Sequence, residues 1–526
     1  MTRRFFALLA LGAASAASAA ARPPERPKLV LAIVIDQFRY DYLTRFRGDY
    51  TGGLDRLLRQ GAVFTNARYE HVPTVTACGH AILMTGAMPS LSGIVGNDWI
   101  DRETGKKVTS VSDDSVRLLG AEGKGASPRR LLASTLGDEM KMAGKGKPRV
   151  IGISLKDRAA ILPAGHLADG AYWFDSHSGA FVSSTFYFPD LPQWVKEFNR
   201  GRPAGQYLGA EWKPLVPSPD YPAFAKTLAG AAGPEFYTSL DASPFGNELV
   251  EAFAERAIEG ERLGQRGPTD LLTVSFSSND YVGHDVGPEA PEVRDMAIRA
   301  DRLIGRLLDF VEAKVGPGNT LVVLTADHGV APLPGIPEHA KMPGGRLSSK
   351  AILGAIEAAL KKSFGDGPWV AGGSGEAPYL NRGLIRTRKL SEAEVERVAA
   401  QAVAAIPHVF RVYTREQLLN GAAIDDQITR RVVNGYCPSR SSDLVVLEEA
   451  YWIPLAQGAS HGSAFGYDTH VPVIFMGPNI RAGRYDRNIL PNDIAPTLAT
   501  MLEVETPSGA AGRVLAEMLS GGSASH

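Results

Sequence analysis

The hydrophobic pattern of the chain contains three apolar stretches, each followed within a few residues by a side chain able to bind a metal ion. The stretches are 29–35, 271–276 and 321–325, and the polar residues that follow them are Asp36, Asp280 and Asp327. Continuous apolar runs of this length are typical of strands buried on both faces, as in a parallel sheet covered by helices. Residues beyond the carboxyl ends of such strands converge on one crevice. The pattern therefore predicts that the three aspartates lie close together.

The remaining pattern alternates between strand-like and helix-like segments. Further strands are expected at 63–68, 149–155 and 471–476, and helices at 53–60, 77–84, 127–143, 247–259, 291–315 and 493–502. This alternation predicts an α/β fold with a mostly parallel central sheet and helices on both faces.

Two segments depart from the alternation and are expected to be insertions in a core that spans 27–521. Residues 170–245 are aromatic and rich in Gly and Pro, which indicates either a hairpin over the crevice or a separate small domain. Residues 344–449 contain a helix of their own at 391–406, flanked by short strands. Both segments are interpreted as cap or subdomain insertions.

The N-terminus has the features of an export signal. Arg3 and Arg4 precede an apolar stretch at 5–12 and a tail of small residues, which predicts a secretory signal peptide over 1–21 rather than a merely disordered or anchoring end. The apolar stretch is too short to span a bilayer, and no other window is long enough. We therefore expect a periplasmic or secreted protein without a membrane anchor.

Composition and charge narrow the classes of partner. The chain has 526 residues, of which 44% are hydrophobic, so it can bury a large core. Loss of the two leader arginines would give the mature chain a net charge of −3, and no basic run is present. Nucleic acid is therefore not expected as a structural partner. The sequence does not indicate an oligomeric state.

Two cysteines, Cys78 and Cys437, are too few for a disulfide scaffold in a chain of this length. Whether they pair is left open by the sequence. Cys78 lies two residues after Thr76 and is an alternative nucleophile, but an exported thiol is prone to oxidation. Cys78 is more readily interpreted as a small hydrophobic residue buried in the core.

Histidines near the three aspartates suggest two metal sites. Asp280, His284 and a late histidine form one candidate ligand set. Asp36, Asp327, His328 and the Thr76 oxygen form the other. Mixed nitrogen and oxygen ligands favour zinc, although manganese and iron use the same ligand types. We therefore expect two Zn²⁺ ions per chain, with other divalent metals as alternatives.

Thr76 is the candidate nucleophile because of its place before the expected helix 77–84. At the N-cap of that helix, its hydroxyl would meet the backbone N–H groups and the positive end of the helix dipole, which attract an anion. Thr74 is the local rival, since residues two apart in an extended segment point to the same side.

The motifs as an ordered set resemble the alkaline phosphatase superfamily, and more narrowly the secreted bacterial alkaline phosphatases of the PafA/PhoK type, which use a threonine nucleophile. The resemblance extends over about 36–493. The residues that support it are Asp36, Thr76 in Thr-Ala-Cys-Gly-His, Asn97 in Gly-Asn-Asp, Lys156-Asp157-Arg158, Asp280-x-x-x-His284, Asp327-His328-Gly329 and His461-Gly462.

The resemblance implies a role for each of these residues. Thr76 would become phosphorylated, and Asn97, Lys156 and Arg158 would hold the nonbridging phosphate oxygens. His461 matches the His-Gly element and is preferred as the third imidazole over His470, which directly precedes a strand. The implied reaction is hydrolysis of phosphate monoesters through a phospho-threonine intermediate, with broad substrate use.

Charge counting favours monoesters over diesters. Two divalent cations would offset the three aspartates and a Thr76 alkoxide, so Lys156 and Arg158 add two positive charges that match a phosphate monoester dianion. The nearest alternative is a nucleotide pyrophosphatase/phosphodiesterase of the same superfamily. A sulfatase lacks support, because Cys78 is not in the Cys/Ser-x-Pro-x-Arg context. An exported binding protein with structural metals is the alternative from another class.

Overall fold

The computed structural model describes residues 26–335, 341–374, 377–421 and 426–520. The expected signal peptide at 1–21 lies outside the described residues. No helix in the described ranges is both long and apolar enough to cross a membrane.

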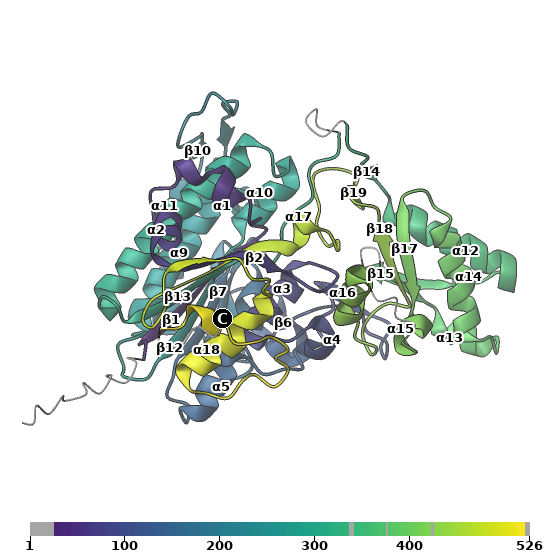
Figure 1. Cartoon of the computed structure of the whole chain (residues 1–526), viewed down its shortest axis with the longest axis horizontal. Coiled ribbons are helices and arrows are strands. Elements are labelled where there is room, and N and C mark those ends of the chain that lie inside the picture. Colours follow the sequence, from purple (N-terminus) through teal and green to yellow (C-terminus); the bar gives the residue numbers. More distant parts are fainter. Residues whose placement is uncertain (1–25, 336–340, 375–376, 422–425, 521–526) are drawn as a thin grey trace, which may run out of the picture.

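A central sheet organises the molecule, and its middle strands are parallel (Figure 1). From one edge to the other the eleven strands are β21 (Gly483–Tyr485), β2 (Ala62–Arg68), β20 (His470–Met476), β13 (Thr320–Thr325), β1 (Leu29–Ile35), β12 (Asp270–Phe276), β7 (Val150–Ser154), β8 (Gly170–Asp175), β9 (Ala180–Ser184), β5 (Ser112–Leu119) and β6 (Lys124–Ala126). The run from β13 to β8 is parallel throughout, and antiparallel strands extend it on both sides. The predicted α/β fold with a mostly parallel core is confirmed.

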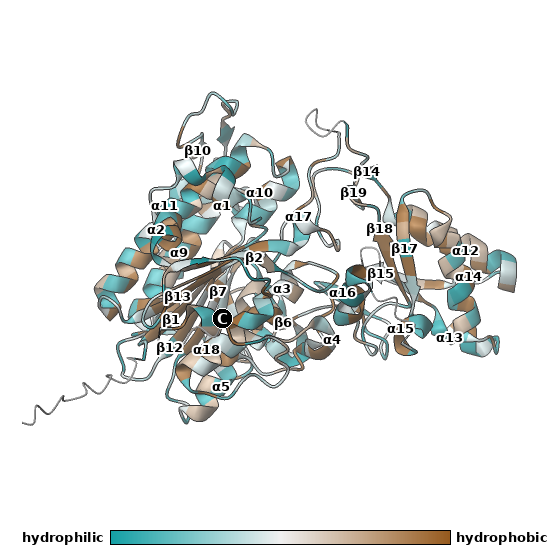
Figure 2. Ribbon diagram, in the orientation of Figure 1, coloured by the Kyte–Doolittle hydropathy of each residue, from teal (hydrophilic) through white to brown (hydrophobic). Residues whose placement is uncertain are grey.

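Alternate residues of β1 enter two different cores. Leu29, Leu31 and Ile33 pack with α9 (Pro244–Gly260) and α11 (Pro291–Val315) on one face. Val30 and Ala32 pack with α5 (Leu136–Ala143) and α18 (Ile494–Leu502) on the other. Figure 2 shows the hydrophobic strands between helices whose outer faces are hydrophilic. Because each buried aliphatic side chain contributes about 2 kcal/mol, both faces fix the register of the strand that leads to Asp36.

One expected helix is shorter than the pattern suggested. A helix was predicted over 127–143, but α5 begins only at Leu136. Thr135 forms a capping box with Asp138, in which the Thr135 hydroxyl oxygen accepts a hydrogen bond from the Asp138 backbone N–H. The cap stops the helix from extending toward the N-terminus.

The segment 170–245 begins within the sheet rather than over the crevice. Strands β8 and β9 form a hairpin that continues the sheet beyond β7. Helices α7 (Gln193–Arg200) and α8 (Pro234–Asp241) follow, and Trp194 and Phe236 join the main hydrophobic core. The aromatic composition of this segment is therefore explained by core packing.

The segment 344–449 has a hydrophobic core of its own. Helices α12 (Ser349–Phe364) and α14 (Glu392–Ala404) pack with β17 (Val409–Thr414) and β18 (Leu444–Glu448) around residues such as Ile356, Trp369 and Val395. Figure 1 shows these elements, in green, to one side of the central sheet. Helix α16 (Gln427–Gly435) lies where this segment meets the sheet.

The buried carboxylate of Asp301 connects helix α11 to the start of a second helix, α2 (Gly53–Gln60). Asp301 of α11 accepts backbone hydrogen bonds from Thr51, Gly52, Leu54 and Asp55, at 2.7–3.1 Å. It therefore caps α2, whose own N-cap, Gly52, has no side chain to do so.

We expect Asp301→Ala to lower the free energy of unfolding by about 3 kcal/mol, since four backbone donors, one of them buried, would lose a charged acceptor. Denaturant unfolding measures the change. The control is Asp309→Ala on the same helix, whose side chain is 79% exposed, and it should change stability by less than about 0.5 kcal/mol. Equal effects of the two substitutions would contradict the capping role.

Candidate active site

The three aspartates meet at the carboxyl end of the sheet, and all three are buried. Asp36 follows β1 directly, and Asp327 lies two residues after β13. Asp280 was expected at a strand end but lies in the first turn of α10 (Ser278–Val286). The helix places Asp280 and His284 on one face, four residues apart, with Asp280 Oδ1 3.3 Å from His284 Nε2.

Asp280, His284 and His461 form the first candidate metal group, with one ligand atom from each within 4.8 Å of the others. His284 Nδ1 lies 2.8 Å from the Ala459 carbonyl, and His461 Nδ1 lies 2.8 Å from the Thr74 carbonyl. Because a carbonyl only accepts, both Nδ1 atoms carry the proton. The Nε2 lone pairs then face each other at 3.2 Å, an arrangement that a shared cation would stabilise.

His470 does not enter this group. Its ring stacks on Tyr40, and its Nε2 lies 3.0 Å from the Thr65 carbonyl. Burial, followed by the positive charge of Arg68, lowers the pKa of His470 to about 4. Of the two histidines considered for the third imidazole, the structure brings only His461 to the cluster.

Asp36, Asp280 and His328 form the second candidate metal group. His328 Nε2 lies 3.5 Å from Asp36 Oδ1 and 3.3 Å from Asp327 Oδ2. Asp280 was expected in one ligand set only, but it belongs to both groups. Asp327 borders the second group and also contacts His80, with 3.2 Å between its Oδ2 and His80 Nδ1.

Unsatisfied carboxylate oxygens support a cation at this second group. Asp36 Oδ1 and Asp327 Oδ2 are buried and have no hydrogen-bond partner among the described residues. Burial, and then the negative charge of Asp327, raise the pKa of Asp36 well above its ordinary value. Buried anions at such short range need compensating charge, so the residues present fit a divalent cation.

Thr76 is the first residue of α3 (Thr76–Thr85), and Val75 is the N-cap, one residue earlier than predicted. Thr76 Oγ1 lies 3.4 Å from His328 Nε2 and is buried. The Thr74 hydroxyl instead donates to the Ser463 carbonyl at 2.9 Å. The hydroxyl beside the metal groups is therefore that of Thr76.

Cys78 belongs to neither metal group. Its Sγ lies 3.1 Å from the Ile94 carbonyl, and burial raises the pKa of the thiol. A thiol with a raised pKa is a poor nucleophile. Cys78 and Cys437 are both free, so the pairing left open by the sequence is not formed.

Asn97 binds the N-terminal turn of α3. Its side-chain oxygen accepts a hydrogen bond from the Ala77 backbone N–H at 2.9 Å. This contact orients the side-chain amide beside Thr76. Asn97 also lines a cavity of about 380 Å³ that is bordered by His284 and His461.

Lys156 and Arg158 occupy different places in the structure. Lys156 Nζ lies 2.6 Å from Asp36 Oδ2 and 2.5 Å from Asp280 Oδ2, two carboxylates of the second metal group. Burial would lower the pKa of Lys156, but the charges of Asp280 and Asp36 outweigh it and raise the pKa. Arg158 is a quarter exposed, and its Nη1 lies 3.7 Å from the neighbouring Asp157. Both were expected to face phosphate oxygens, yet Lys156 is bound to the carboxylates.

Gln37 is a site residue that the sequence analysis did not identify. Its backbone N–H donates to Asp327 Oδ1 at 3.1 Å, and its side-chain amide donates to Asp280 Oδ1 at 2.6 Å. It has a positive φ of 62°, and a Cβ on Gly283 would come within 1.9 Å of its Oε1. The only sequence signal is its position next to Asp36.

We expect Gln37→Ala to weaken metal binding by about 10–100-fold, because Gln37 orients carboxylates of both metal groups. Metal retention in competition with a chelator measures this loss. Gln193→Ala removes only a surface hydrogen bond to Glu197 and serves as the control. Wild-type metal retention in Gln37→Ala would show that Gln37 does not position the ligands.

A family model described as Type I phosphodiesterase / nucleotide pyrophosphatase matches residues 30–468. The chain belongs to this family. It shares its fold alone with murine ectonucleotide pyrophosphatase/phosphodiesterase 5, at 16% identity and a TM-score of 0.51 over 93% of this chain and 100% of that one.

Within the alkaline phosphatase superfamily the chain groups with bacterial alkaline phosphatases. It is 36% identical to alkaline phosphatase PhoV of Synechococcus elongatus, over 94% of this chain and 93% of that protein. It is 37% identical to alkaline phosphatase PafA of Elizabethkingia meningoseptica, over 94% and 95%. The crystal structure of PafA matches with a TM-score of 0.88 and 36% identity, over 95% of this chain and all of that one. The protein is therefore an enzyme of the alkaline phosphatase type.

Proposed function

We propose that the protein hydrolyses phosphate monoesters with Thr76 as the nucleophile. The observation that supports this most directly is the position of the Thr76 hydroxyl, at the start of α3 and 3.4 Å from His328 Nε2, beside both metal-ligand groups. A crystal structure is also known of a PafA variant in which a threonine, an asparagine, a lysine and an arginine are replaced. These are the four residue types assigned here to Thr76, Asn97, Lys156 and Arg158.

Two divalent cations, zinc by ligand type, would be held by Asp280, His284 and His461 and by Asp36, Asp327, His328 and the Thr76 oxygen, with Asp280 shared between the groups. When bound, such ions supply positive charge to phosphoryl oxygens and favour ionised oxygen nucleophiles. Two observations support metal dependence: the candidate ligand groups and the similarity to a bacterial alkaline phosphatase.

The protein's own groups act around the phosphoryl centre in two displacements. Thr76 Oγ1 forms a bond to phosphorus while the ester oxygen departs, and water then cleaves the phospho-threonine to restore the hydroxyl. The backbone N–H groups and dipole at the start of α3 stabilise negative charge on Oγ1. The Asn97 amide and the Arg158 guanidinium donate to nonbridging oxygens. Lys156 adds positive charge between Asp36 and Asp280.

The cavity of about 380 Å³ beside these groups supports broad use of substrates. Its lining combines the catalytic Asn97, His284 and His461 with apolar side chains of the 344–449 segment and its neighbours, such as Val446 and Trp452. An apolar lining recognises the organic part of a monoester by contact area rather than by specific hydrogen bonds. Small-molecule phosphate monoesters are thus the proposed substrates.

We also propose that the chain consists of one core with an inserted subdomain. Residues 27–521 would form one catalytic core with 344–449 as an inserted subdomain, which the separate hydrophobic core of that segment supports. Residues 170–245 would extend the core and would not form a cap over the crevice, since β8 and β9 continue the sheet. The leader at 1–21 would direct the enzyme to the periplasm or the medium.

Arg158→Ala is expected to separate monoesters from diesters. We expect kcat/KM for p-nitrophenyl phosphate to fall about 100-fold, because a donor to a dianionic phosphoryl group is lost. The same constant for bis(p-nitrophenyl) phosphate should fall by less than about tenfold, since a diester carries one charge fewer.

Arg256→Ala is the control for Arg158→Ala, because Arg256 forms only a surface ion pair with Glu259. It should leave both rates unchanged. A loss confined to the diester in Arg158→Ala would overturn the monoesterase assignment and favour a nucleotide pyrophosphatase/phosphodiesterase.

A further inference from the structure

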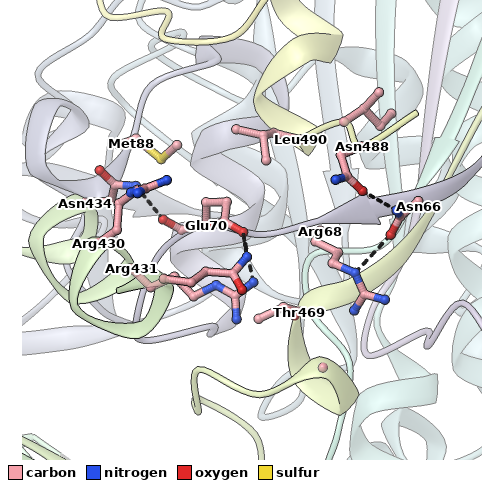
Figure 3. Close-up of a pocket in the computed structure, with 13 residues that line it drawn as sticks. Asn66, Arg68, Glu70, Met88, Arg430, Arg431, Asn434, Thr469, Asn488 and Leu490 are labelled. Carbon is pink, nitrogen blue, oxygen red and sulfur yellow. Dashed lines mark hydrogen bonds and ion pairs between the residues drawn. The ribbon is translucent and has the colours of Figure 1, made fainter. Parts of the chain in front are cut away.

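A second cavity, of about 620 Å³, lies between the central sheet and α16 (Figure 3). Its lining includes Arg68 at the end of β2, Glu70, Thr469 and Asn488, together with Arg431 and Asn434 of α16. No residue assigned above to catalysis or metal binding lines it. The 380 Å³ cavity is lined by other residues of the same helix, Val432 and Gly435. The two cavities therefore have separate linings.

Positive side chains predominate in the 620 Å³ cavity. Its lining contains the guanidinium groups of Arg68 and Arg431, and Glu70 is the one carboxylate among the described residues that line it. Glu70 Oε1 is already bound to Arg431 Nη2 at 2.9 Å and to the Gln427 amide at 2.8 Å. The hydrogen bond of Arg68 is to a neutral group, with Nε donating to Asn66 Oδ1 at 3.0 Å. Glu70 therefore does not balance the guanidinium charges of both Arg68 and Arg431.

Arg68 and Arg431 also act on each other electrostatically. Burial, followed by the positive charge of Arg431, lowers the pKa of Arg68. Figure 3 shows the side chains of Arg68 and Arg431 on either side of Thr469. Repulsion between two partly desolvated guanidinium groups is relieved when an anion binds between them.

Two buried donors of the lining lack partners. Arg431 is 6% exposed and Thr469 is fully buried. Arg431 Nε and Thr469 Oγ1 have no hydrogen-bond partner among the described residues. Buried N–H and O–H groups are nearly always paired in folded proteins, so an unpaired set at one cavity indicates a missing acceptor.

We propose that this cavity is a second anion-binding site, specific for a phosphate-type oxyanion and separate from the catalytic centre. A tetrahedral oxyanion offers acceptor oxygens in several directions, as donors from β2, α16 and the Thr469 region require. Arginine forks bind such groups through paired hydrogen bonds. The oxyanion is either free orthophosphate or the phosphoryl group of a small organic phosphate.

The test is calorimetric titration of the metal-loaded full chain at low ionic strength, with inorganic phosphate in one arm and phenylphosphonate in the other. We expect two binding events per chain in at least one arm. The arm with the tighter second event identifies free phosphate or an organic phosphate as the ligand. A single binding event in both arms overturns the proposal.

Two substitutions with opposite expected effects on affinity test whether the second binding event takes place in this cavity. Arg68→Gln should weaken it about tenfold, because a charged donor is lost. Glu70→Gln should strengthen it, since the one carboxylate among the described lining residues is removed. Neither should change turnover of p-nitrophenyl phosphate at low phosphate concentration. Loss of folding cannot tighten binding, so equal effects of the two variants overturn the assignment, as does a second event weakened only by Arg158→Ala.

Discussion

Replacing Thr76 with alanine is expected to lower kcat for phosphate monoesters by about four orders of magnitude or more. The substitution removes the atom that attacks phosphorus, and loss of the nucleophile in other double-displacement hydrolases has effects of this size. The fold and the metal content should remain, because Thr76 Oγ1 is only one of several donors at the second metal group. Steady-state kinetics with p-nitrophenyl phosphate and elemental analysis of the same preparation provide the measurements.

Thr74→Ala is the matched control for Thr76→Ala. The Thr74 hydroxyl donates to the Ser463 carbonyl, so its loss should cost about 1 kcal/mol of stability and little turnover. Thr76→Ser keeps the hydroxyl and should retain measurable activity. Turnover in Thr76→Ala that stays within tenfold of wild type would exclude Thr76 as the nucleophile. Phosphoryl label trapped on the wild type but absent from Thr76→Ala would agree with the proposed intermediate.

The convergence of Asp36 and Asp327 could be predicted from the sequence because the physical signal is local. Buried parallel strands are apolar on both faces, and the first polar residue after each strand marks its carboxyl end. The structure places both aspartates at that edge of the sheet. The choice between His461 and His470 had no such signal, and it depends on which carbonyl each imidazole meets.

Other features of the site depend on packing that the sequence does not encode locally. Asp280 joins both metal groups because α10 begins at Ser278, two residues before it, so that the first turn of a helix and not the end of β12 positions its carboxylate. Gln37 reaches Asp280 only because its backbone adopts a positive φ and Gly283 leaves room for its side chain. Neither condition is visible in the hydrophobic pattern.

The position of Lys156 shows why the charge of this site has to be considered as a whole. The sequence assigned Lys156 to the substrate, whereas its ammonium group lies between Asp36 and Asp280. Three buried carboxylates within one cluster repel one another, so any nearby cation is drawn to them. Lys156 therefore contributes to the electrostatic balance of the metal groups.

Metal removal is expected to abolish monoester turnover, and Asp280 is expected to control both metal groups. Dialysis against a chelator should reduce activity to background, and added Zn²⁺ should restore it, because Asp36 Oδ1 and Asp327 Oδ2 are buried carboxylate oxygens with no hydrogen-bond partner among the described residues. Asp280→Asn should lower the metal content of both groups, since its carboxylate belongs to each. His284→Ala should lower only one.

Elemental analysis after dialysis distinguishes these cases independently of activity. Wild type should retain two equivalents per chain, His284→Ala about one and Asp280→Asn fewer than one. His470→Ala is the matched control, because that imidazole binds the Thr65 carbonyl away from the cluster. Identical metal content in His284→Ala and Asp280→Asn would show that the two groups do not share Asp280. Unchanged turnover in a metal-free preparation would refute the two-metal mechanism, because Lys156 alone cannot offset three buried carboxylates and a phosphate dianion.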